Sequence, residues 1–89
     1  MPEYKLSFKG GPRNGDNLPL DGNQSLVFGR DNKCDVQLLD ARLSRYHLRL
    51  EKKGNDVIVY DLDSTNGTYV NGQRVTQANL KHHDEVRLG

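Results

Sequence analysis

The chain has 89 residues, enough for one domain with one hydrophobic core but too few for two independently stable domains. Its 13 Lys and Arg residues nearly balance 12 Asp and Glu, so a net charge of +1 gives no field that would attract nucleic acid or an anionic membrane. The single cysteine excludes an internal disulfide and favours an intracellular location, cytoplasmic or nuclear. No apolar run approaches the roughly 20 residues of a membrane helix. The sequence predicts one soluble domain over residues 1–89.

Short alternating segments separated by turn residues make up the first third of the chain. Apolar and polar side chains alternate over residues 4–8, the pattern of a strand with one buried face. Residues 10–12 interrupt this run, and two leucines on either side of Pro19 predict a short or edge strand that completes a hairpin. Residues 26–28 predict a third strand.

Similar patterns continue through the rest of the chain. Residues 47–51 alternate as a strand, and residues 53–56 have the composition of a hairpin turn. Residues 57–60 are apolar on both faces and predict a central strand. Asn71-Gly72 lies between two strand-like triplets, which predicts a type I′ hairpin turn because both central residues of that turn need positive φ.

The C-terminal residues complete an all-β pattern. Residues 76–84 are polar and predict a loop, and residues 85–88 predict the last strand. No window of eleven or more residues shows helical periodicity free of Gly and Pro. About eight to ten short strands with frequent turn signals indicate an all-β sandwich or barrel of mainly antiparallel strands.

Five motifs in the order and spacing of one family extend over residues 26–88. They are Phe28-Gly29-Arg30, Cys34-Asp35-Val36-Gln37-Leu38, Ser44-Arg45-Tyr46-His47, the run from Asp61 to Gly72, and Asp84-Glu85-Val86-Arg87-Leu88-Gly89. On these motifs the chain resembles forkhead-associated (FHA) domains, β-sandwich modules with an FHA/SMAD-like fold that bind phosphothreonine peptides. The resemblance implies a non-enzymatic interaction module in signalling, without a cofactor, as part of a larger protein.

One departure concerns the C-terminal end. Family members usually carry another strand after the position of Leu88-Gly89, which pairs back toward the N-terminal strand. The resemblance therefore implies a sandwich without its last strand, either because the chain is truncated or because that strand comes from elsewhere. The edge beside residues 4–8 would then be unpaired, and an unpaired edge invites association.

The resemblance assigns phosphopeptide binding to five residues on separate loops: Arg30, Ser44, Arg45, Thr65 and Asn66. Arg30 has a planar fork of N–H donors that suits two phosphate oxygens, and Ser44 and Thr65 have hydroxyl and backbone donors. Asn66 can pair with a peptide main chain as both donor and acceptor. The structural alternatives are a solvated arginine for Arg30 and turn or capping roles for Ser44, Thr65 and Asn66.

Gly29, His47 and Gly67 are expected to support the site, with Gly29 allowing close loop approach and His47 bracing the binding loop. Ser44 and His47 also raise a hydrolase hypothesis, but residues three apart on a strand face opposite ways, and no Gly-x-Ser-x-Gly elbow is present. His82-His83-Asp84 lacks a second ligand cluster, and Cys34 has no partner cysteine for zinc, so no metal is predicted.

Arg42 is a candidate specificity residue. In the family its loop helps to read the residue three places after the phosphothreonine, and a basic side chain there would favour an acidic ligand residue. A solvated arginine is the equal alternative. The predicted partner is a phosphothreonine-containing protein or peptide. The main alternative is a structural or oligomeric module that ignores phosphate.

Overall fold

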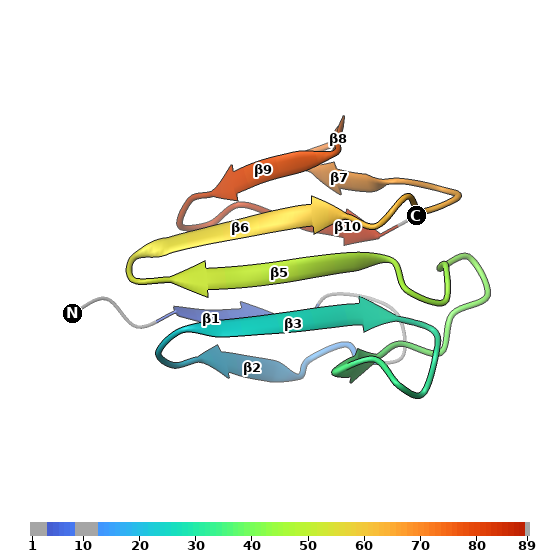
Figure 1. Ribbon diagram of the computed structural model, residues 1–89, viewed down its shortest axis with the longest axis horizontal. Coiled ribbons are helices and arrows are strands. Elements are labelled where there is room, and N and C mark those ends of the chain that lie inside the picture. Colours follow the sequence, from blue (N-terminus) through green and yellow to red (C-terminus); the bar gives the residue numbers. More distant parts are fainter. Residues whose placement is uncertain (1–3, 9–12, 89) are drawn as a thin grey trace.

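The computed structural model describes residues 4–8 and 13–88, which contain strands and no helix (Figure 1). The strands are β1 (Tyr4–Ser7), β2 (Asn17–Leu20), β3 (Gln24–Gly29), β4 (Val36–Gln37), β5 (Leu48–Lys53), β6 (Asp56–Asp61), β7 (Thr68–Val70), β8 (Gln73–Val75), β9 (Gln77–Leu80) and β10 (Val86–Leu88). Across these residues there is accordingly no helix of the length and apolarity that a membrane span requires. The predicted all-β class is confirmed.

The strands form sheets of five, three and two strands. The five-stranded sheet has the order β4-β3-β5-β6-β9, and its long strands β3, β5 and β6 lie side by side (Figure 1). The second sheet has the order β10-β7-β8, and β1 pairs with β2. Among the described strands every pairing is antiparallel except the parallel pairing of β3 with β4. The expected sandwich of mainly antiparallel strands is therefore present.

The hydrophobic core lies between the sheets. Along β5, Leu48 and Leu50 are buried while Arg49 lies on the opposite face, as the period-2 alternation predicts. Half-buried apolar residues of the two smaller sheets, such as Leu18 and Val86, pack against this core. Burial of these faces holds the strand ends, and thus the loops between them, in fixed positions.

The expected hairpins are observed. Asn71 and Gly72 join β7 to β8 with φ values of 51° and 84°, which confirms the predicted turn with two left-handed residues. Gly54 has a φ of 59° in the turn between β5 and β6. β1 and β2 pair antiparallel, although the interrupting residues 10–12 lie outside the described part of the chain.

The predicted loop over residues 76–84 is wrong in its first half. Gln77–Leu80 forms β9, which pairs with β6 so that Ala78 is opposite Val59. Ala78 and Leu80 are half-buried and alternate with exposed polar residues. Two apolar residues in a polar stretch are a weak signal, and pairing with the strongly β-prone β6 decides the conformation.

Candidate functional site

Three loops meet at one end of the five-stranded sheet (Figure 1). They are the Arg30 loop (residues 30–35), the Ser44 loop (residues 38–47) and the Asn66 loop (residues 62–67). The backbone N–H groups of Arg30 and Asp31 donate to the carbonyl oxygens of Ser44 and Arg45, each at 3.1 Å. The Thr65 N–H donates to Ser44 Oγ at 3.0 Å. The Ser44 loop is therefore bonded to both of the others.

A pocket of about 200 Å³ lies where these loops meet. Its lining residues are Arg30, Ala41, Arg42, Leu43, Ser44, Thr65 and Asn66. The structure thus brings together four of the five predicted phosphopeptide-binding residues and the candidate specificity residue. Arg45 does not line the pocket.

Arg30 is exposed at the pocket, and its guanidinium group is fixed by one bond. Its Nε–H donates to the carbonyl oxygen of Leu43 at 3.1 Å. The other guanidinium N–H groups have no partner within residues 4–8 and 13–88. Arg30 therefore presents an oriented cation with donors available to an anion.

The Ser44 hydroxyl accepts the hydrogen bond from Thr65 N–H and keeps its own proton available for donation. This bond occupies the Thr65 backbone N–H, which was one of the two donors predicted to contact a ligand. Thr65 is an exposed residue that lines the pocket.

His47 is fully buried and joins two of the loops. The backbone N–H of Ser44 donates to its Nδ1 at 3.1 Å, so Nε2 carries the ring proton and donates to the Gly67 carbonyl oxygen at 2.8 Å. Residues three apart on a regular strand would face opposite ways, but this loop bends sharply enough for Ser44 and His47 to meet. They meet through the serine backbone and not through its hydroxyl, so the geometry is not that of a nucleophile and its base.

Two glycines allow the loops to approach closely. A side chain at Gly29 would collide with the carbonyl oxygen of Arg45. Gly67 has a φ of 92°, a left-handed conformation that favours glycine, and it lies against the side chain of Arg74. Glycine at these two positions therefore permits the observed backbone, and the support that they give to a binding site stays a prediction.

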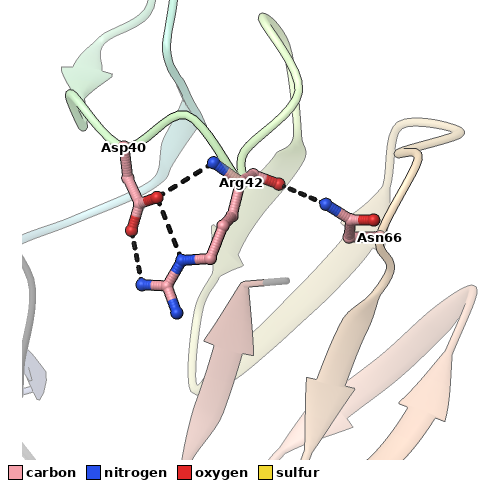
Figure 2. Close-up of polar contacts among 3 residues, drawn as sticks. All are labelled: Asp40, Arg42 and Asn66. Carbon is pink, nitrogen blue, oxygen red and sulfur yellow. Dashed lines mark hydrogen bonds and ion pairs between the residues drawn. The ribbon is translucent and has the colours of Figure 1, made fainter.

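Asn66 and Arg42 form a chain of contacts across the pocket rim (Figure 2). The Asn66 Nδ2–H donates to the Arg42 carbonyl oxygen at 2.7 Å, while the Arg42 side chain pairs with Asp40. The Asn66 amide oxygen has no hydrogen-bond partner among the described residues.

Arg45 contributes its main chain to loop packing. Its carbonyl oxygen accepts hydrogen bonds from Asp31 N–H and from the Cys34 thiol, both at 3.1 Å. Burial raises the pKa of that thiol, which keeps it protonated as a donor. The Arg45 side chain is exposed outside the pocket lining. Its predicted contact with a ligand stays a prediction.

Asp61 organises the base of the Asn66 loop, a role that was not predicted from the sequence. Its carboxylate accepts hydrogen bonds from the hydroxyls of Ser64 at 2.5 Å and Thr68 at 2.7 Å, and from the Ser64 N–H at 3.2 Å. Ser64 Oγ in turn accepts from Gly67 N–H. An Asp followed by Ser three residues later and Thr seven residues later is the available sequence signal.

The Asp61 network predicts a pH-dependent stability. Burial acts to raise the pKa of Asp61, but hydrogen bonds from Ser64 and Thr68 outweigh it and lower the pKa below 3.8. A lowered folded-state pKa contributes stability above the unfolded value, and that contribution is lost as the pH falls through the folded-state pKa. We expect Asp61→Asn to reduce the free energy of unfolding at neutral pH, and this difference to shrink as the pH falls through the lowered folded-state pKa of Asp61.

Urea unfolding of both proteins across this pH range measures the effect. The exposed Asp63→Asn change serves as a control with the same charge difference. If the difference in the free energy of unfolding between wild type and Asp61→Asn stayed constant from neutral to acidic pH, the stabilising role of the ionised Asp61 carboxylate would be contradicted.

The sequence matches known proteins along most of its length. The FHA domain family model matches residues 26–89. The chain is 39% identical over 85 residues to the glycogen accumulation regulator GarA of Mycobacterium tuberculosis, covering 94% of this chain and 51% of GarA. It is 34% identical over 92 residues to an FHA domain-containing protein of Arabidopsis thaliana, covering 99% of this chain and 24% of that protein. The chain thus spans about half the length of GarA and about a quarter of the length of the Arabidopsis protein.

Solved structures share the fold. The FHA domain of CT664 from Chlamydia trachomatis aligns with a TM-score of 0.92 at 28% identity, covering 99% of this chain and 90% of that chain. The N-terminal FHA domain of Rad53p from S. cerevisiae, solved with a phosphothreonine peptide, aligns with a TM-score of 0.66 at 34% identity, covering 74% and 56% of the two chains. The motif resemblance is confirmed, and the chain belongs to the FHA domain family.

Proposed function

We propose that this domain binds phosphothreonine-containing peptides through the pocket between the Arg30, Ser44 and Asn66 loops. The observation that carries this proposal is the Arg30 side chain, which the Leu43 carbonyl oxygen orients in a pocket that Ser44 also lines. A phosphoryl group has about −1.5 to −2 charges and three strong acceptor oxygens, so it matches a fixed cation with neighbouring donors. Related FHA domains support the assignment, since the Rad53p domain was solved with such a peptide.

The remaining predicted residues take complementary roles in this proposal. The Thr65 hydroxyl donates to the phosphate, and the Asn66 amide oxygen accepts from the ligand main chain. Arg45, outside the pocket lining, contacts the ligand from the rim. Gly29, His47 and Gly67 hold the loops in position and do not touch the ligand.

The proposed module is one non-enzymatic domain of a larger intracellular protein. Within residues 4–8 and 13–88, no general base is bonded to the Ser44 hydroxyl: the Thr65 N–H donates to that oxygen, and His47 accepts from the Ser44 backbone N–H. Recognition of a phosphorylated partner by directed donors and an arginine needs no cofactor.

An oriented peptide library tests this function. The library fixes phosphothreonine, phosphoserine or threonine at its centre and varies the flanking residues. We expect the phosphothreonine library to be retained and the threonine library to be lost, because the phosphate supplies the groups that Arg30 and Ser44 bind. Retention of all three libraries to the same extent would contradict phosphate recognition.

A further inference from the structure

The side chain of Arg42, the candidate specificity residue, is paired with the carboxylate of Asp40. Asp40 Oδ2 lies 2.6 Å from Arg42 Nη2, and Asp40 Oδ1 accepts from Arg42 Nε–H at 3.1 Å and from the Arg42 backbone N–H at 2.9 Å. Figure 2 shows the Arg42 side chain turned toward Asp40, while its carbonyl oxygen faces Asn66. The geometry is a bidentate ion pair within one loop.

Asp40 is the anchored member of this pair. Its backbone N–H donates to the Leu38 carbonyl oxygen at 2.9 Å, and its own carbonyl oxygen accepts from Leu43 N–H at 3.0 Å. Its side chain is 20% exposed, against 74% for the Arg42 side chain. Hydrogen bonds from Arg42 lower the pKa of Asp40 to about 2, so the carboxylate is charged at neutral pH. Arg42 therefore meets a fixed anion before any ligand arrives.

The pair lies at the rim of the proposed binding pocket. Arg42 lines that pocket, and Asn66, the proposed receptor for the ligand main chain, bonds the Arg42 carbonyl. Asp40 uses Nε and one Nη2 donor of the guanidinium, which leaves a ligand carboxylate only the other edge. A second carboxylate at that edge would also be repelled by Asp40.

We propose that Asp40 is a specificity-determining residue that competes with acidic ligand residues for Arg42 and so suppresses a preference for them. This inference rests on the proposed phosphothreonine binding. Because Asp40 is only two residues from Arg42 in the same loop, its carboxylate is present at a high effective concentration at the Arg42 guanidinium. A ligand carboxylate is also held nearby once the phosphate is bound, so the two carboxylates compete on similar terms.

The test uses Asp40→Asn, which removes the charge but keeps a side-chain oxygen for the Arg42 backbone N–H. Calorimetry compares phosphothreonine peptides that carry Asp or Ala at each of the four positions after the phosphothreonine. We expect the wild type to distinguish Asp from Ala by less than about twofold, and Asp40→Asn to raise the preference for Asp about three- to fivefold at one position, the range of an exposed ion pair. Any effect of the lost charge on phosphate affinity is shared by the Asp and Ala peptides and cancels in the preference.

Two controls make the result specific. Asp63→Asn removes one negative charge from the neighbouring loop without touching the pair, and should leave the preference unchanged. The double change Asp40→Asn with Arg42→Gln should abolish the gain in preference for Asp, because the guanidinium group for which the two carboxylates compete is then absent.

The outcomes separate the two proposals. An unchanged or reduced preference for Asp in Asp40→Asn, with phosphothreonine binding intact, would overturn the competition and leave the binding function standing. A gain that persists without Arg42, or that Asp63→Asn reproduces, would also overturn it. Failure of the wild type to bind any of the phosphothreonine peptides would overturn both.

Discussion

Replacing Arg30 with alanine is expected to lower the affinity for a phosphothreonine peptide by at least about a hundredfold. Two charge-assisted hydrogen bonds to phosphate are lost, each worth about 1.5–3 kcal/mol. The fold should be little affected, because the side chain is exposed and loses only its bond to the Leu43 carbonyl, a change of about 1 kcal/mol. Calorimetric titration measures the affinity, and urea unfolding measures the stability.

Two variants define what Arg30 contributes. Lys33→Ala removes the same charge from an exposed position in the same loop, outside the pocket lining, and should leave the affinity within about twofold. Arg30→Lys keeps the charge but loses the planar fork, so its affinity should lie between wild type and Arg30→Ala. If Arg30→Ala bound as well as Lys33→Ala does, Arg30 would not be the phosphate receptor.

His47→Ala is expected to lower the free energy of unfolding by about 3 kcal/mol. The change leaves the Ser44 N–H and the Gly67 carbonyl without their partner, at about 1–3 kcal/mol for each buried group, and creates a cavity in a fully buried position. Peptide affinity should also fall, since these bonds hold the Ser44 and Asn66 loops together. Urea unfolding followed by circular dichroism measures the loss of stability.

The matched control is His82→Ala, which removes an exposed imidazole from the loop after β9. It should change the free energy of unfolding by no more than about 0.5 kcal/mol. Equal stability of the two alanine variants would contradict the structural role of His47. If the His47→Ala protein were less stable but kept its phosphopeptide affinity, His47 would stabilise the fold without positioning the binding loops.

Local patterns were sufficient to predict most of the fold. The Asn71-Gly72 turn needs two left-handed residues, and few other dipeptides satisfy that geometry. Residues 57–60 are apolar on both faces, and β6 is indeed flanked by strands on both sides. β9 was missed because its conformation depends on pairing with β6 and not on its own composition.

The sequence indicated which candidate residues would lie together, but not the hydrogen bonds between them. Family motifs indicated Arg30, Ser44, Thr65 and Asn66, and these residues line one pocket. The bond from Thr65 N–H to Ser44 Oγ joins residues 21 apart in sequence, so local patterning gives no sign of it. The pairing of Asp40 with Arg42 likewise needed coordinates, because residues two apart interact only when the loop conformation turns them together.

The most direct test of phosphate recognition is a calorimetric titration of wild-type protein with one library-selected phosphothreonine peptide and its unphosphorylated twin. Binding through Arg30 and Ser44 predicts measurable heat and saturation for the phosphorylated peptide and no detectable binding for the twin. Equal affinity for both peptides, retained after Arg30→Ala and Ser44→Ala, would contradict phosphate recognition and would instead indicate an interaction surface that ignores phosphate.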